Sequence, residues 1–187
     1  LKKVCKILTK AKFITIDTEF IREKTYWSQL CLIQVCSDNI EVIIDPLEEE
    51  IDLTPFIKIL NKKSVLKVLH SGRQDIEIFY KISGKIPSPI FDTQVAAMVC
   101  GFGDSVGYEK LVDKILKKKI DKSSRFSNWA KRPLTKQQLQ YAIGDVTHLY
   151  EIYPILNNKL KETKRTKWLD EELKILTSED TYNTNPE

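Results

Sequence analysis

A strand-like segment near the start of the chain carries two carboxylates on one face. Residues 13–20 alternate with a period of two, which is typical of a half-buried β-strand. Residues two apart in a strand project to the same side, so Asp17 and Glu19 project together. Carboxylates beside an apolar segment are costly unless a cation meets them, and this segment contains no basic residue. A cation between the two carboxylates is therefore favourable, although the D-x-E pattern by itself is more simply explained by two acids on an exposed strand face.

Two more acidic residues lie in distinctive places. Asp75 opens a predicted helix, and Asp145 follows Tyr141 by four residues on a helix predicted to begin at Thr135. Each feature alone has a plainer explanation: exposed strand acids, compensation of a helix dipole, or a packed tyrosine. Taken together, the four carboxylates predict a site for divalent metal ions.

The composition is that of an ordinary globular domain. The chain has 187 residues, 42% hydrophobic and 30% charged, with no apolar run of membrane-spanning length and no signal-peptide pattern. Four cysteines without a C-x-x-C pair, and two histidines, disfavour structural zinc. We expect the cysteines to be reduced, buried thiols in a cytoplasmic protein.

Positive charge is concentrated in one stretch. Residues 110–136 hold ten Lys or Arg against two Asp, a local net charge of +8, whereas the whole chain carries +4. A basic stretch beside an acidic metal site suits a phosphodiester substrate. For Lys117, Lys118 and Lys119 alone, a solvated helix face rich in lysine is the slightly favoured interpretation.

The hydrophobic pattern predicts an α/β chain. Strands are expected at residues 13–20, 30–36, 40–44 and 65–69, with a turn at 37–39. Helices are expected from Thr54 as N-cap, from Asp75, from Asp92 as N-cap, over 108–116 and from Thr135, with Pro154 ending or kinking the last. Residues 178–187 have the polar composition of a linker or tail.

These motifs carry a resemblance to a known family. D-x-E on a first strand, Asp at a helix start and Y-x-x-x-D on a late helix resemble the DEDD superfamily of 3′–5′ exonucleases, tyrosine subgroup. The surrounding sequence looks like bacterial ribonuclease D from about residue 13 to the end, in the segments 25–34, 68–70, 91–94 and 129–134.

The resemblance implies an RNase H-like fold, with a mixed central sheet flanked by helices. It implies that Asp17, Glu19, Asp75 and Asp145 bind two Mg²⁺ or Mn²⁺ ions and that Tyr141 orients the attacking water. Oxygen ligands suit these ions, and two ions about 3.5–4 Å apart can bind the attacking and leaving oxygens of a displacement. The expected reaction removes nucleotides from RNA 3′ ends, in the maturation of tRNA or other stable RNA.

We further expect nucleic-acid contacts in or beside these motifs. The expected partners are single-stranded RNA 3′ ends, including tRNA precursors, with neither a membrane nor an obligate protein partner. A DNA exonuclease and an inactive nucleic-acid-binding relative are the alternatives, and Y-x-x-x-D disfavours an RNase H-type endonuclease. The residues expected to contact nucleic acid are Thr18, Phe20, His70, Lys117, Lys118, Lys119, Trp129 and Arg132.

The expected domain division places the exonuclease domain at residues 1–176. Residues 177–187 would form a linker or tail that leads toward a C-terminal HRDC domain, which the family usually carries. Since the chain starts at Leu1 rather than Met and stops at Glu187, we expect it to be a piece of a longer protein.

Overall fold

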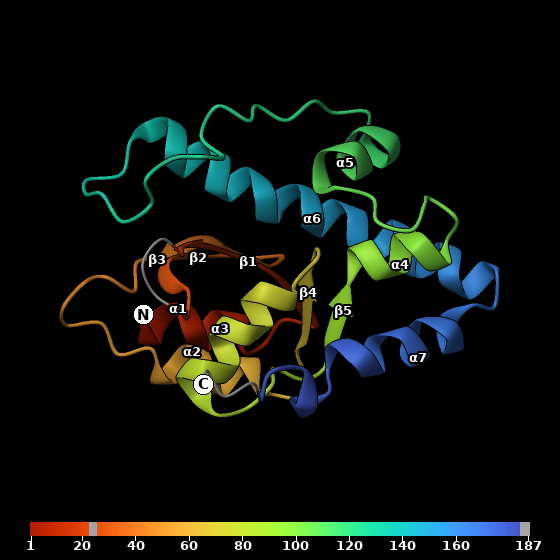
Figure 1. The fold of residues 1–187 in the computed structure, drawn as a ribbon, viewed down its shortest axis with the longest axis horizontal. Coiled ribbons are helices and arrows are strands. Elements are labelled where there is room, and N and C mark those ends of the chain that lie inside the picture. Colours follow the sequence, from red (N-terminus) through yellow and green to blue (C-terminus); the bar gives the residue numbers. More distant parts are fainter. Residues whose placement is uncertain (23–25, 184–187) are drawn as a thin grey trace.

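A five-stranded mixed sheet forms the centre of the molecule in a computed structural model, which describes residues 1–22 and 26–183 (Figure 1). The strand order is β3-β2-β1-β4-β5, so the first strand is the central one. β2 pairs antiparallel with β1 and β3, whereas β1, β4 and β5 run parallel. The strands are β1 Phe13–Ile21, β2 Gln29–Cys36, β3 Glu41–Ile44, β4 Leu66–Leu69 and β5 Ile90–Asp92.

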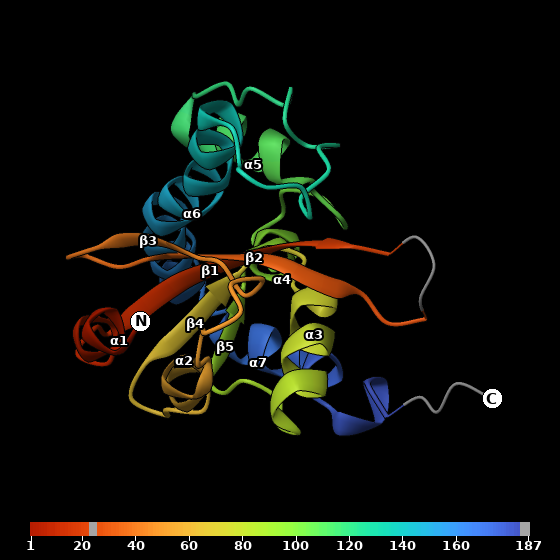
Figure 2. The same cartoon turned by 90° about the vertical axis from the view of Figure 1, so that its left-hand side faces the viewer.

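Helices cover both faces of this sheet. The long helix α6 crosses one face with α5 beside it, and α1, α2 and α3 lie on the other (Figure 2). α4 and α7 pack together near β5. The α-helices are α1 Lys2–Leu8, α2 Thr54–Leu60, α3 Arg73–Ser83, α4 Thr93–Val99, α5 Tyr108–Leu116, α6 Lys136–Glu162 and α7 Thr166–Leu176, followed by the 3₁₀ turn η1 Glu179–Thr181. This arrangement confirms the predicted α/β class with a mixed sheet flanked by helices.

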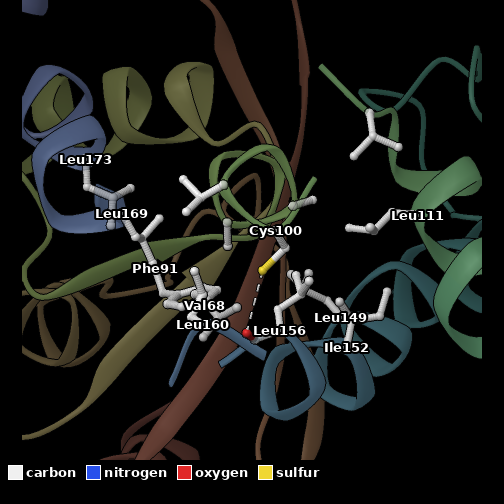
Figure 3. Close-up of a cluster of buried hydrophobic side chains, with 14 of the residues drawn as sticks. Val68, Phe91, Cys100, Leu111, Leu149, Ile152, Leu156, Leu160, Leu169 and Leu173 are labelled. Carbon is white, nitrogen blue, oxygen red and sulfur yellow. Dashed lines mark hydrogen bonds between the residues drawn. The ribbon is translucent and has the colours of Figure 1, made fainter. Parts of the chain in front are cut away.

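The alternation of β1 divides its side chains between two cores. Phe13 stacks on Tyr150 of α6, with ring centroids 4.5 Å apart. Ile14 and Ile16 face the other way, into the core formed with α1 and α2. A larger core joins α4, α5, α6 and α7 on the α6 side of the sheet (Figure 3). The predicted common face of Asp17 and Glu19 is therefore the face that α6 covers.

Two predicted helix boundaries are decided by the structure. The helix α6 begins with the predicted capping box of Thr135 and Gln138, and of the two outcomes expected at Pro154, an end is ruled out because the helix runs through it to Glu162. Leu156 and Leu160 are fully buried beyond the proline, so their packing outweighs its missing hydrogen bond. At α2 the N-cap is Leu53, one residue before the predicted Thr54.

The C-terminal part folds further than its composition indicates. α7 was not predicted, and Tyr182, within the segment expected to be a linker or tail, is 1% exposed. It packs near Tyr80 of α3 and donates a hydrogen bond from its hydroxyl to the carbonyl of Leu176. The proposed boundary at 176 stays a prediction. Thr25 of the motif at 25–34, and residues 184–187, lie outside the described residues.

Two expectations from composition match the structure. The cysteines Cys5, Cys31, Cys36 and Cys100 are buried, free thiols. Across residues 1–22 and 26–183, no helix combines the length and the apolar character needed to cross a membrane.

Candidate active site

Three of the four predicted carboxylates meet between β1 and α6. One oxygen from each of Asp17, Glu19 and Asp145 lies within 4.8 Å of the other two. The hydroxyl of Thr15 on β1 donates a 2.7 Å hydrogen bond to the carbonyl of Val146, which neighbours Asp145. This bond, and the stacking of Phe13 on Tyr150, hold α6 so that Asp145 faces the acidic pair of the strand.

Asp75 approaches from the opposite side of the sheet. It lies in the first turn of α3, is 7% exposed, and accepts a 2.5 Å hydrogen bond from the hydroxyl of Thr18. Thr18 points away from Asp17 and Glu19 along the strand, which explains why Asp75 stands outside the group of three. Among neighbouring charges, however, that of Asp75 contributes most to raising the pKa of Asp17.

Burial and mutual repulsion disfavour the ionised form of these carboxylates when no cation is bound. Desolvation, followed by neighbouring carboxylates, raises the pKa of Asp17 well above its usual value and that of Glu19 to about 8. Burial also raises the pKa of Asp145 to about 7 and that of Asp75 to about 6. None of the ion pairs among the described residues involves these four groups. A set of buried carboxylate oxygens of this kind fits Mg²⁺ or Mn²⁺.

Two tyrosines lie at the Asp145 end of the group. The Tyr141 side chain lies close enough to the Asp145 carboxylate for each to act on the pKa of the other, and burial, followed by the nearby carboxylates, raises the pKa of the tyrosine. Tyr141 therefore keeps its proton and is not a base at neutral pH. The hydroxyl of Tyr108, at the start of α5, donates to the main-chain carbonyl of Asp145. Sequence reasoning missed Tyr108, because its contact partner lies 37 residues away.

Two hollows, each of about 460 Å³, lie on either side of the carboxylates. Both are lined by Asp17, Tyr141, Asp145 and Arg125. The first, the α5 hollow, is completed by His70, Gly107, Tyr108, Glu109, Lys110, Ile120, Lys122 and Leu149. The second, the aromatic hollow, is completed by Thr18, Glu19, Phe20, Ile21, Arg22, Phe126, Ser127 and Trp129. The carboxylates therefore lie where a chain-like substrate can extend to both sides.

Arg125 and Phe126 are candidate substrate residues that sequence reasoning did not single out. The positive charge of Arg125 lowers the pKa of Asp145, against the larger effect of burial. Phe126 is 92% exposed, and its ring lies 5.4 Å from the Arg125 guanidinium carbon. An arginine followed by an aromatic residue inside the basic stretch was the available signal.

The other predicted nucleic-acid contacts lie in different surroundings. Phe20 and Trp129 line the aromatic hollow, although Trp129 is only 2% exposed. His70 lines the α5 hollow, and its Nδ1 lies 2.9 Å from the Thr93 hydroxyl. The hydroxyl of Thr18 donates its hydrogen bond to Asp75.

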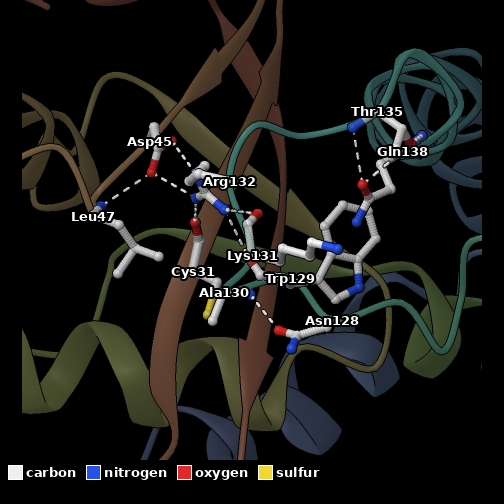
Figure 4. A network of polar contacts seen from close by, with 10 residues as sticks. All are labelled: Cys31, Asp45, Leu47, Asn128, Trp129, Ala130, Lys131, Arg132, Thr135 and Gln138. Carbon is white, nitrogen blue, oxygen red and sulfur yellow. Dashed lines mark hydrogen bonds and ion pairs between the residues drawn. The ribbon is translucent and has the colours of Figure 1, made fainter.

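The predicted basic residues divide into two groups. Lys117 ends α5 in a left-handed conformation, and Lys118 forms an exposed 2.8 Å ion pair with Glu151, while Lys119 is exposed. Arg132 is partly buried instead, and each of its N–H groups has an acceptor within the protein (Figure 4). We therefore keep the three lysines as candidate RNA contacts and give Arg132 a structural role.

Comparison with known proteins places this geometry in context. A family model described as a 3′–5′ exonuclease matches residues 1–161. Ribonuclease D of Bartonella henselae is 49% identical over 176 residues, covering 94% of this chain and 43% of that protein. Ribonuclease D of Jannaschia sp. is 53% identical over 179 residues, covering 94% of this chain and 46% of that protein. The chain thus spans about half the length of the curated relatives it matches.

Solved structures agree with the sequence relatives. The crystal structure of Escherichia coli RNase D, described as an exoribonuclease involved in structured RNA processing, superposes with a TM-score of 0.93 at 32% identity, covering 98% of this chain and 48% of that one. Brucella melitensis NrnC with bound Mg²⁺ gives a TM-score of 0.79 at 26% identity, and the match covers 91% of this chain and 84% of that one. The predicted similarity to ribonuclease D is confirmed by these matches.

Proposed function

Because this chain belongs to the 3′–5′ exonuclease family, we propose that it is the catalytic part of a ribonuclease D-type enzyme that removes nucleotides from RNA 3′ ends. The observation that carries the proposal is the cluster of Asp17, Glu19 and Asp145, open to a hollow on each side. The names of its relatives favour RNA over DNA. We propose stable RNAs such as tRNA precursors as substrates, in the cytoplasm, without an obligate protein partner.

Asp17, Glu19, Asp75 and Asp145 are the residues that would hold two divalent ions, Mg²⁺ or Mn²⁺. Their raised pKa values support this proposal, because such values mean that a proton or a cation that neutralises these groups stabilises the folded protein. Such ions, when bound, acidify the attacking water and stabilise the departing 3′ oxygen.

The protein's own groups orient the reactants. Tyr141 keeps its proton, so its hydroxyl can donate to Asp145 while its oxygen lone pairs accept a hydrogen bond from the attacking water. Arg125, which borders both hollows, can neutralise negative charge on the scissile phosphate. Phe20 and Phe126 offer aromatic faces for stacking of bases in the aromatic hollow. Lys117, Lys118 and Lys119 extend the positive surface along the substrate.

A time course on 5′-labelled RNA, with and without divalent metal, tests this proposal. The expected result is a descending ladder of shortened products that requires Mg²⁺ or Mn²⁺, and no cleavage of an RNA with a blocked 3′ end. Internal cleavage of the blocked RNA would overturn the exonuclease assignment. Faster digestion of the matched DNA strand would favour the alternative, a DNA exonuclease. Absence of cleavage with either ion would favour an inactive relative.

A further inference from the structure

The guanidinium of Arg132 is completely engaged inside the protein. An arginine has five N–H donors, and here each has an acceptor within hydrogen-bonding distance. Nε and Nη2 donate hydrogen bonds to the two carboxylate oxygens of Asp45, at 2.6 and 2.7 Å. The remaining three donors reach main-chain carbonyls: Cys31 at 2.9 Å from Nη2, and Trp129 at 2.7 Å and Lys131 at 3.0 Å from Nη1. This side chain has no N–H left for a substrate.

Asp45 is itself held in place. It follows β3, and its Oδ1 also accepts a 3.0 Å hydrogen bond from the main-chain N–H of Leu47. The hydrogen bonds from Arg132 lower the pKa of this carboxyl, so it stays charged at neutral pH. The Asp45–Arg132 pair therefore ties the segment before α6 to the edge of the sheet at two points, the end of β3 and the carbonyl of Cys31 on β2. Figure 4 shows the network.

The contacts continue from Arg132 to the candidate catalytic tyrosine. Arg132 holds the main chain of Trp129, whose indole is buried in a cluster with Cys31, Leu32 and Ala142. The Trp129 ring also packs beside Tyr141, with centroids 6.1 Å apart. Tyr141 in turn lines the same two hollows as Asp145 and acts on its pKa. A series of contacts thus leads from the sheet edge to the tyrosine beside the proposed metal-binding carboxylate.

We propose that Asp45 and Arg132 are positioning residues that hold the Trp129 ring against Tyr141, and so keep the tyrosine hydroxyl directed at Asp145. This inference rests on the proposed function for its catalytic consequence but not for its structural one. A tyrosine side chain that rotates freely about its Cα–Cβ bond leaves its hydroxyl in the productive place for only part of the time. A misplacement of about 1 Å can cost a large part of a catalytic rate, up to about 10²-fold.

The structural part is tested by fluorescence of Trp129. In a Trp27→Phe, Trp168→Phe background, Trp129 is the remaining tryptophan. Arg132→Met removes all five N–H donors. Asp45→Asn weakens the hydrogen bonds between residues 45 and 132, but the arginine can still donate to the three main-chain carbonyls. Both should shift the Trp129 emission to the red and increase its quenching by acrylamide. Glu48→Gln is the matched control, since Glu48 lines the same surface hollow without a hydrogen bond to Arg132, and it should change neither property.

The catalytic part is tested by a double-mutant cycle with Tyr141→Phe. Asp45→Asn and Arg132→Met should each lower kcat by about 10-fold with a smaller change in KM. In the Tyr141→Phe background they should lower kcat by less than about 2-fold, because the hydroxyl that they position is already absent. Arg132→Lys keeps the charge but not the planar fork, so its kcat should lie nearer that of Arg132→Met than that of the parent protein.

Each result decides the proposal. Unchanged Trp129 emission in folded Asp45→Asn and Arg132→Met would overturn it. So would a fall in kcat as large in the Tyr141→Phe background as in the parent, which indicates general destabilisation. If Arg132→Met does not fold by circular dichroism, Asp45→Asn and Arg132→Lys carry the same test. If the parent protein does not shorten RNA, the proposed function fails, while the Trp129 emission still decides whether the pair holds the ring.

Discussion

Tyr141 and Asp145 lie one helical turn apart on α6 and line the same two hollows, where each side chain shifts the pKa of the other. This pairing places the group that we propose to orient water beside one that we propose to bind metal. It arises because residues four apart on a helix share a face, and because α6 turns that face toward β1. The tyrosine keeps its proton at neutral pH, since burial and three carboxylates raise its pKa.

Tyr141→Phe removes the hydroxyl but keeps the ring beside Trp129. We expect the cleavage rate to fall by about 10²-fold or more, which is the lower range for a positioned proton-transfer group. RNA affinity in chelator, measured by fluorescence anisotropy, should stay within a factor of two. A normal cleavage rate in this variant would make Tyr141 a packing residue only.

Asp75→Asn tests the carboxylate that approaches from α3. The amide oxygen of the variant can still accept the hydrogen bond from Thr18, so the fold should be kept while one negative metal ligand is removed. We expect cleavage to be abolished and the melting temperature in chelator to be equal or higher. Thr18→Val is the comparison, because it removes the hydrogen bond and leaves the charge. Turnover at the parent rate in Asp75→Asn would contradict a role for Asp75 in metal binding.

The metal-free protein should lose stability as the pH rises. Glu19 titrates near 8 and Asp145 near 7 in the folded state, above their usual values of 4.5 and 3.8, so the folded protein binds more protons than the unfolded chain between these limits. The stabilisation from these protons is fully present below about pH 4 and is lost as the pH rises through 7 to 8.

Urea unfolding in chelator at pH 5, 6.5 and 8 measures this loss. Saturating Mg²⁺ should remove most of the decline, and Glu19→Gln should make it shallower. A free energy of unfolding that rises over this interval in chelator would show that the carboxylates do not repel one another as the structure indicates.

Phe126→Ala should weaken substrate binding without affecting the fold. Phe126 is 92% exposed, so its removal costs no core packing. Stacking of a base on an aromatic side chain contributes roughly 1–3 kcal/mol, so we expect KM to rise by roughly 10-fold. Phe126→Trp keeps an aromatic face and should retain most of the affinity. Equal KM values for the alanine variant and the parent protein would remove Phe126 from the substrate path.

Replacing Lys117, Lys118 and Lys119 by Ala tests the basic surface. If these lysines bind phosphates, the log–log salt dependence of RNA binding should flatten by roughly 0.7 for each lysine–phosphate interaction that the substitutions remove. Lys2, Lys3 and Lys6, exposed on α1 across the sheet from α6, provide a control triple of equal charge. Equal salt slopes for the two triple variants would show that residues 117–119 form only a solvated face.

The sequence by itself determined the local features of the site. The period-two pattern of β1 placed Asp17 and Glu19 on one face, and the spacing of four placed Tyr141 and Asp145 on one helical face, because these periodicities follow from backbone geometry alone. The capping box of Thr135 and the N-cap of Asp92 are also local, and both are present. The local pattern left open whether Pro154 ends or kinks the helix, because the tertiary packing of Leu156 and Leu160 decides whether the helix continues.

Only the tertiary structure decided how these local features meet. Thr18, which alternation directs away from the acidic pair, joins Asp75 to the site from the other side of the sheet. Arg132 lies in the basic stretch and was expected to contact RNA, yet Asp45, 87 residues away, and three main-chain carbonyls engage its guanidinium. Arg125, seven residues before it, remains beside the carboxylates. Whether an arginine faces solvent or the protein depends on acceptors brought together by folding, and no spacing within the sequence encodes their positions.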